Sequence, residues 1–245
     1  MSKRVQLMNE DFQITAWSES AVAVQFGQKI DPDLHKKVKA LTLYLEHHPF
    51  EGLLEVVPAF ANVTVFFDPV IISIKNERPS TYVSALLKEI LLNLQAMKTE
   101  TERTVVIPVC YGGEFGPDLE FVAQYNHLSV EEVIHIHSES EYLVYMIGFA
   151  PGFPYLGGLS ERIATPRKSK PRLRIPAGAV GIGGAQTGVY SISTPGGWQL
   201  IGQTPLTLFL QKEDRPSLLR SGDRVRFQPV SRNEYDALKE DQKWR

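Results

Sequence analysis

The first hundred residues combine helical and strand-like spacing of apolar positions. Apolar side chains recur every three or four positions between Asp31-Pro32 and Pro49, and again from Val83 to Leu94. Aspartate followed by proline is a typical helix start, so this spacing predicts two amphipathic helices. Shorter apolar runs predict strands at residues 19–26, 53–57 and 62–67. We therefore expect a small α/β layer, with a sheet on one side and helices on the other.

The pattern changes beyond the charged segment 98–103, which we interpret as a linker. A β-branched strand is predicted at 104–109, a short helix from Gly116-Pro117-Asp118 to Tyr125, and another helix after the capping box Ser129-x-x-Glu132. Short strands separated by Gly/Pro turns follow, at residues 142–147, 180–182, 189–192, 199–201, 206–210 and 224–228. This spacing is typical of a closed or nearly closed β-barrel. The predicted fold class is α+β, with a small α/β N-terminal domain at residues 1–100 and a β-barrel domain at 101–245.

The composition is that of an ordinary globular protein. Of the 245 residues, 43% are hydrophobic and 22% are charged, and the net charge of -2 gives no electrostatic reason to expect a nucleic-acid or membrane partner. The single cysteine, Cys110, has no internal partner and lies in an apolar strand, so we expect it to be buried and inert. The N-terminus lacks the apolar run of a signal peptide, and no apolar stretch is long enough to span a bilayer. We therefore expect a cytoplasmic protein.

Glycine is concentrated between Arg172 and Pro205. Because glycine loses more backbone freedom on folding than other residues do, such a cluster indicates turns with positive φ or another surface that comes close. The run fits neither a Walker loop nor a dinucleotide fingerprint, which would need glycine where Gln186 stands. Two interpretations remain, a pocket lined by backbone or the turns and bulges of a barrel. In a pocket, Gln186, Thr187 and Thr194 would be polar wall residues.

A basic run leads into this segment without any acidic residue between its members, which are Arg162, Arg167, Lys168, Lys170, Arg172 and Arg174. Runs of this kind are commonly solvated loops. Prolines stiffen this one, however, and the guanidinium group suits planar carboxylate or phosphate groups. We therefore expect substrate or phosphate contacts from Arg167, Arg172 and Arg174.

Two carboxylates flank the turn at residues 113–118. Asp118 is expected to stabilise the N-terminus of the following helix through the helix dipole. Glu114 has no such structural role, so it is our candidate catalytic carboxylate, for metal or proton work. His135 and His137 point in different directions on a helix, so we expect no metal site from them but satisfied or exposed histidines.

Residues 148–159 are apolar but follow neither the strand nor the helix period. Their prolines and glycines argue against a regular element. The stretch either packs over the barrel or forms an apolar docking patch for a partner protein. In the second case the contact residues are Phe149, Phe153, Tyr155 and, from the glycine-rich run, Trp198.

Several long strings resemble the PxpB/KipI family, whose members are the B-type subunits of 5-oxoprolinase and are also called allophanate hydrolase subunit 1. The strings are Tyr111–Leu119, Gly148–Phe153, Pro166-Arg167 and the run from Pro176 to Pro205. The resemblance covers nearly the whole chain and implies a small α/β domain followed by a cyclophilin-like β-barrel. The chain departs from the usual strings at Ala179, Ser191 and Gln203, where relatives often have Ser, Pro and Arg or Lys.

This resemblance implies a non-autonomous subunit of an ATP-dependent 5-oxoprolinase. Proteins of the family act with PxpA and PxpC to open the lactam of 5-oxo-L-proline to L-glutamate, with ATP and magnesium in a site shared with the partner subunits. Phosphorylation of the lactam oxygen would create a leaving group and would need nearby cations. An alternative implied by the resemblance is inhibition of a sporulation histidine kinase (KinA-type) by protein–protein binding. A third is a role as a component that acts on a related urea-derived amide.

Overall fold

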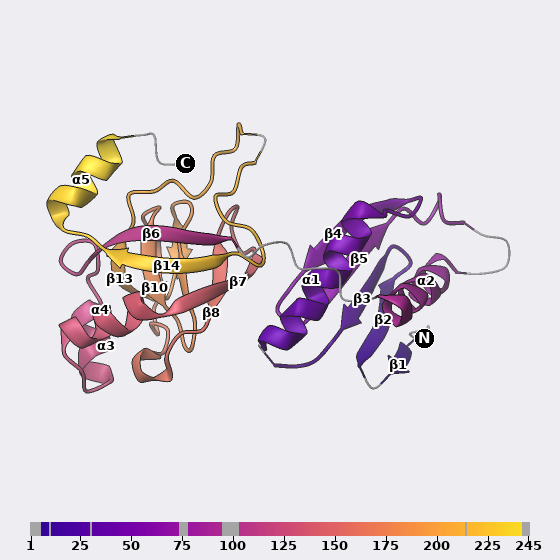
Figure 1. Ribbon diagram of the computed structural model, residues 1–245, viewed down its shortest axis with the longest axis horizontal. Helices are drawn as coiled ribbons and strands as arrows, with labels where there is room; N and C mark the ends of the chain where they lie inside the picture. The colour runs from indigo at the N-terminus through magenta and orange to yellow at the C-terminus, as the bar shows by residue number, and fades with distance from the viewer. Residues whose placement is uncertain are drawn as a thin grey trace. The chain divides into compact units, whose positions relative to one another are not determined.

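The structure is a computed structural model that describes residues 11–29, 31–73, 78–94, 103–213 and 215–241, and the backbone of residues 6–9. The chain divides into two compact units, residues 1–101 and 102–245. Both units combine helices with a sheet or barrel (Figure 1), so the α+β class is confirmed. The expected linker at 98–103 lies, apart from Arg103, outside the described residues.

The described residues of the first unit form an antiparallel five-stranded sheet in the order β1-β2-β3-β5-β4. Its strands are β1 (Gln6–Asn9), β2 (Phe12–Ser18), β3 (Ala21–Gln25), β4 (Leu53–Pro58) and β5 (Asn62–Phe67). The helices α1 (Pro32–His47) and α2 (Pro79–Asn93) supply Leu41 and Leu87 to a buried cluster that also holds Val65 of β5. The sheet and helices therefore share one core, as the spacing predicts.

Local sequence sets the start of α1. Asp31 Oδ1 accepts hydrogen bonds from the backbone N–H groups of Asp33 and Leu34, at 2.8 and 3.2 Å. These bonds satisfy donors that have no partner within the helix, so the predicted start is confirmed. In contrast, β2 is absent from the predicted elements. Its inward residues Phe12, Ile14 and Ala16 nevertheless alternate with more exposed ones, which is the period of a half-buried strand.

The described residues of the second unit form a closed barrel in the order β10-β11-β8-β7-β14-β6-β13. Its strands are β6 (Thr104–Tyr111), β7 (Glu141–Ile147), β8 (Pro154–Gly157), β10 (Ala179–Ile182), β11 (Thr187–Val189), β13 (Gln199–Gln203) and β14 (Arg224–Pro229). Figure 1 shows β6 and β14 side by side, and their register is parallel, with Ile107 opposite Phe227. Closure leaves no open sheet edge, as the regular strand spacing predicts.

Further elements surround the barrel. They are α3 (Leu119–Tyr125), α4 (Val130–Glu139), the short helix η1 (Glu161–Ile163), the ribbon of β9 (Arg172–Ile175) with β12 (Thr194–Gly196), and α5 (Arg232–Glu240). The predicted capping box at the start of α4 is confirmed, since Ser129 and Glu132 each bond the backbone N–H of the other. An equivalent box, Ser231 with Glu234, begins α5, a helix that is absent from the predicted elements.

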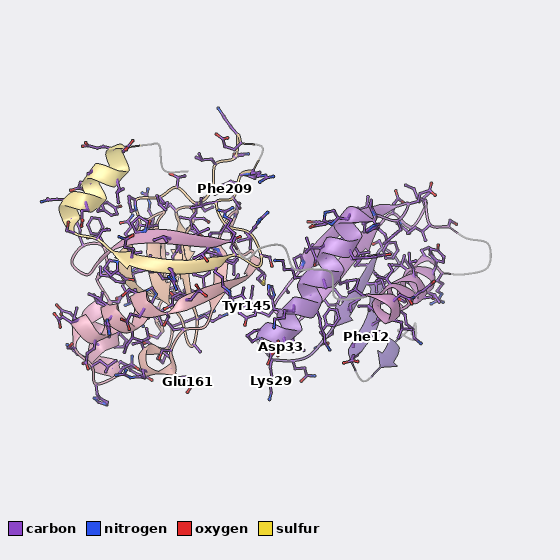
Figure 2. The ribbon with its side chains drawn as sticks, viewed as in Figure 1. Phe12, Lys29, Asp33, Tyr145, Glu161 and Phe209 are labelled. Atoms are coloured by element: carbon purple, nitrogen blue, oxygen red, sulfur yellow. The ribbon has the colours of Figure 1, made fainter. Side chains whose placement is uncertain are left out.

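Three predicted segments differ from the structure. Residues 154–157 form β8 although prolines and glycines there argue against a regular element; a proline at the first strand position removes no internal ladder bond. Residues 206–210 form no strand, and Phe209 makes an isolated bridge with Ser217. Figure 2 shows Phe209 far from Glu161 of η1, at the other end of this unit. The strand expected at 189–192 lies instead at Thr187–Val189.

Among the described residues, none of the helices has the length and apolar character that a membrane crossing needs.

Candidate functional site

A cavity of about 230 Å³ lies in the second unit, and it is called the aromatic cavity below. Five aromatic side chains line it, from Phe149, Phe153, Tyr155, Tyr190 and Trp198. The other lining residues are Arg167, Pro171, Pro195, Gly196 and Gly197. The fold therefore brings together the apolar stretch, the basic run and the glycine-rich run, which are separate in the sequence.

The base of the aromatic cavity is a packed ring cluster. The Phe153 ring lies edge-on to those of Tyr190 and Trp198, with centroid distances of 5.4 and 5.6 Å. All three side chains are buried. Edge-to-face pairs of this kind stabilise one another beyond simple burial, which makes the base rigid.

Glycines make room for the Trp198 indole. A Cβ at Gly183 would lie 2.5 Å from the indole nitrogen, and a Cβ at Gly188 would lie 3.0 Å from the ring. The close approach of another surface, which a glycine cluster can indicate, therefore explains these two glycines. Barrel turns hold elsewhere, since Gly178 and Gly184 have φ values of 82° and 68°.

Arg167 is the cation of the aromatic cavity. Its guanidinium carbon lies 5.8 Å from the centre of the Trp198 ring, within the range of a cation–π contact. Hydrogen bonds hold the backbone on both sides of Arg167. Gln199 Nε2 donates to the Pro166 carbonyl at 2.8 Å, and the Lys168 N–H donates to the Gly197 carbonyl at 2.7 Å. Among the described residues, no carboxylate forms an ion pair with Arg167.

Asp118 makes contacts with the basic run that the sequence does not predict. It precedes α3, but its side chain makes no capping bond; it accepts instead from Lys168 at 3.0 Å and from Arg172 at 2.8 Å. The Leu200 N–H also donates to it at 2.7 Å. Burial alone would raise the pKa of Asp118, but the bonds from Arg172, Leu200 and Lys168 outweigh it and lower that pKa. Arg172, expected to contact substrate or phosphate, thus shares an internal carboxylate with Lys168, and its contact with a ligand stays a prediction.

Arg174, a predicted anion contact, and the predicted wall residues Thr194 and Gln186 lie apart from the aromatic cavity. Arg174 is exposed on β9, where its Nε donates to Ser193 at 3.3 Å. Thr194 lies on β12 opposite Ile175, and Gln186 is half-buried in the turn between β10 and β11. None of these three lines the aromatic cavity.

Thr187 is fully buried, and it takes part in a hydrogen-bond chain with His137. The Tyr111 hydroxyl lies 2.7 Å from His137 Nδ1, His137 Nε2 lies 2.9 Å from Thr187 Oγ1, and Thr187 donates to the Gly181 carbonyl at 3.0 Å. Since the threonine proton goes to Gly181, the histidine proton lies on Nε2 and Nδ1 accepts. Burial lowers the pKa of His137 to about 3. The prediction of a satisfied histidine is confirmed, and Thr187 is not exposed to a ligand.

Glu114 also lies outside the aromatic cavity. Its carboxylate pairs with Arg232 of α5, whose guanidinium stacks on the Phe115 ring at 4.8 Å. Both partners are well exposed to solvent. Among the described residues, no group of three His, Cys, Asp or Glu side chains is placed to hold a metal ion. This geometry favours a surface contact that fastens α5 over the predicted role of Glu114 in metal or proton work.

Of the four aromatic residues expected to bind a partner, only Phe149 is largely exposed, at 63%. Phe153 and Trp198 are buried in the base of the cavity and Tyr155 is half-buried. The kinase-inhibitor role stays a prediction.

Tyr190 and the proline-glycine wall were not among the predicted site residues. Tyr190 lies in the glycine-rich run, and its hydroxyl is so close to Gly196 that a Cβ there would lie 2.4 Å away. Burial raises the pKa of Tyr190, against opposing effects of the Trp198 backbone and the Arg167 charge. The phenol is therefore protonated at neutral pH, and it is a polar group in an otherwise apolar base.

Comparison with known proteins defines the class first. The model of the family described as carboxyltransferase domain, subdomain C and D, matches residues 12–219. A structure of Kluyveromyces lactis urea carboxylase shares the fold, with a TM-score of 0.77 at 20% identity over 99% of this chain and 24% of that chain.

Full-length relatives are closer. The chain is 52% identical to the B-type subunit of 5-oxoprolinase from Bacillus subtilis (strain 168), over 96% of this chain and 99% of that protein. It is 43% identical to the corresponding 5-oxoprolinase subunit of Escherichia coli O157:H7, over 86% of this chain and 93% of that protein. The chain belongs to the family of B-type 5-oxoprolinase subunits within the carboxyltransferase subdomain C and D class, which confirms the resemblance in its sequence.

Proposed function

We propose that this chain is the B-type subunit of an ATP-dependent 5-oxoprolinase complex, which opens 5-oxo-L-proline to L-glutamate together with PxpA- and PxpC-type partners. The single observation that carries the proposal is the 52% identity to a B-type 5-oxoprolinase subunit over nearly the full length of both chains. The complex, rather than this chain alone, would be the active enzyme.

The geometry supports a subunit with an incomplete active site. The aromatic cavity offers a cation and an apolar base, which suit binding and orientation of a small anion. It offers no carboxylate or neutral histidine to move a proton, because Glu114 and His137 are engaged elsewhere. Proton transfer and phosphoryl chemistry would therefore come from groups on the partner subunits.

The described residues of this chain do not fit the phosphates of ATP by themselves. Lys168 and Arg172 share the carboxylate of Asp118, and the glycine turns carry no phosphate-loop lysine. ATP with magnesium would thus be held in a site that the partner subunits complete. When bound, ATP would supply an activating phosphoryl group for the poorly electrophilic lactam.

Reconstitution tests this proposal. The three purified proteins are mixed with ATP, magnesium and 5-oxo-L-proline, and L-glutamate is measured with each component omitted in turn. We expect glutamate only from the complete mixture, and none from this chain alone. A mixture that forms glutamate at the same rate without this chain would refute the proposal.

A further inference from the structure

We propose that the aromatic cavity is the binding subsite for the substrate ring, with the ligand carboxylate on Arg167 and the flat ring against Tyr190 and Trp198. The chemical class is a small planar ring that carries one carboxylate. The identification of that ring as 5-oxo-L-proline rests on the proposed function, whereas the site itself rests on geometry.

Charge selects Arg167 within the basic run. Lys168 and Arg172 both bond the carboxylate of Asp118, and Arg174 bonds Ser193 away from the cavity. Arg167 alone among these lines the cavity, and no described carboxylate pairs with it. Its guanidinium carbon lies 5.8 Å from the centre of the Trp198 ring, and a guanidinium group in this position can bind the two oxygens of a carboxylate with two of its N–H donors.

The size and lining of the cavity suit a small ring. Its volume of about 230 Å³ is below the roughly 300–1,000 Å³ of sites for drug-sized ligands. Aromatic side chains, prolines and glycines line it, so the CH₂ groups of a small lactam ring would find apolar contacts. The protonated Tyr190 hydroxyl would offer one polar contact to a ring amide.

The site is organised before binding. Hydrogen bonds at Pro166 and Lys168 hold the backbone on either side of Arg167, and ring–ring contacts hold the base. A ligand would therefore lose little affinity to ordering of the protein.

The test is a titration of the full-length chain followed by the indole N–H signal of Trp198, which the Trp198→Phe variant assigns. The probes are 5-oxo-L-proline and 2-pyrrolidinone, the same lactam without a carboxylate. We expect a saturable shift with 5-oxo-L-proline, and affinity weaker by roughly 10- to 100-fold with 2-pyrrolidinone, since a charge-assisted bond is lost.

Variants test the contact itself. Arg167→Gln should weaken 5-oxo-L-proline binding by roughly the same factor, and Arg167→Lys should weaken it less, because the charge remains without the fork. Arg162→Gln is the matched control, an exposed member of the same basic run outside the cavity, and should bind normally. A Trp198 signal that does not move with the wild-type chain, or unchanged binding by Arg167→Gln, would overturn the subsite.

The two proposals fail in different ways. An inactive three-component mixture together with the expected Trp198 titration would reject the proposed function and keep the subsite. An active mixture in which Arg167→Gln leaves both KM and kcat for 5-oxo-L-proline unchanged would keep the function and reject the subsite.

Discussion

Replacement of Asp118 by asparagine removes the negative charge that binds Lys168 and Arg172 of the basic run. The wild-type carboxylate is 5% exposed and contacts Arg172 through both oxygens at 2.8 Å, Lys168 at 3.0 Å and the Leu200 N–H at 2.7 Å. Asparagine keeps the shape but presents an uncharged group to two cations. We therefore expect the barrel unit to be less stable in Asp118→Asn.

The size of the effect follows from burial. Removal of one partner of a buried ion pair costs about 3–5 kcal/mol. The side chains of Lys168 and Arg172 are 32% and 26% exposed, so water compensates part of the loss and the lower end, about 3 kcal/mol, is expected. At about 3 °C per kcal/mol for a unit of this size, Tm of the barrel transition should fall by about 9 °C.

The difference between variant and wild type should also depend on pH. The folded-state pKa of Asp118 is lowered, so its charge stabilises the protein fully above the unfolded pKa and loses this effect as pH falls through the folded pKa. The stability gap should be constant from pH 7 to about 5 and should narrow below about pH 4.

Calorimetry at pH 7 and below pH 4 measures both effects. Asp236→Asn is the matched control, since Asp236 pairs with Arg232 at 2.8 Å but both side chains are more than half exposed. That variant should lose at most about 1 kcal/mol. Equal losses in the two variants at pH 7 would refute the view that buried charge holds the loop.

Two more predictions concern packing and the internal histidine. Gly196→Ala would place a Cβ 2.4 Å from the Tyr190 hydroxyl and should cost about 1–3 kcal/mol in urea unfolding. Its neighbour Gly197→Ala, with 3.6 Å to the nearest atom, should cost less than about 0.5 kcal/mol; equal losses would contradict the crowding. Burial lowers the pKa of His137 to about 3, so below the unfolded pKa of about 6.5 the unfolded chain binds a proton at this residue and the folded protein does not. The contribution of His137 to the free energy of unfolding should therefore be full above pH 6.5 and should fall by about 1.4 kcal/mol per pH unit below it. His137→Gln should be less stable at pH 7 but lose this slope between pH 7 and 5 in urea titrations, and parallel slopes would contradict the assignment.

Elements with local signals were predictable. The start of α1 depends on Asp31 and Pro32, and that of α4 on Ser129 and Glu132, each within one turn of chain. The same type of signal marks α5 at Ser231. β8 was not predictable in this way, because its pairing with β7 and β11 overrides the local effect of its proline and glycine.

The candidate site likewise depends partly on local sequence and partly on contacts between distant segments. Residue types alone pointed to the three segments that line the aromatic cavity, and to Arg167, Phe153 and Trp198 among them. They did not distinguish Arg167 from Arg172, since both arginines lie in one proline-braced basic run. The distinction depends on Asp118, which is 54 positions away from Arg172 in the chain and adjacent to it in the fold.

The sequence by itself thus determined the α+β class, the starts of α1 and α4, the family and the segments in which a site would lie. These features depend on spacing and side-chain type over a few residues. The tertiary structure alone decided which cation stays available, which aromatic rings are buried and which glycines are needed for close approach. Those outcomes depend on long-range neighbours, because burial and ion pairing are properties of the space around a side chain rather than of its position in the chain.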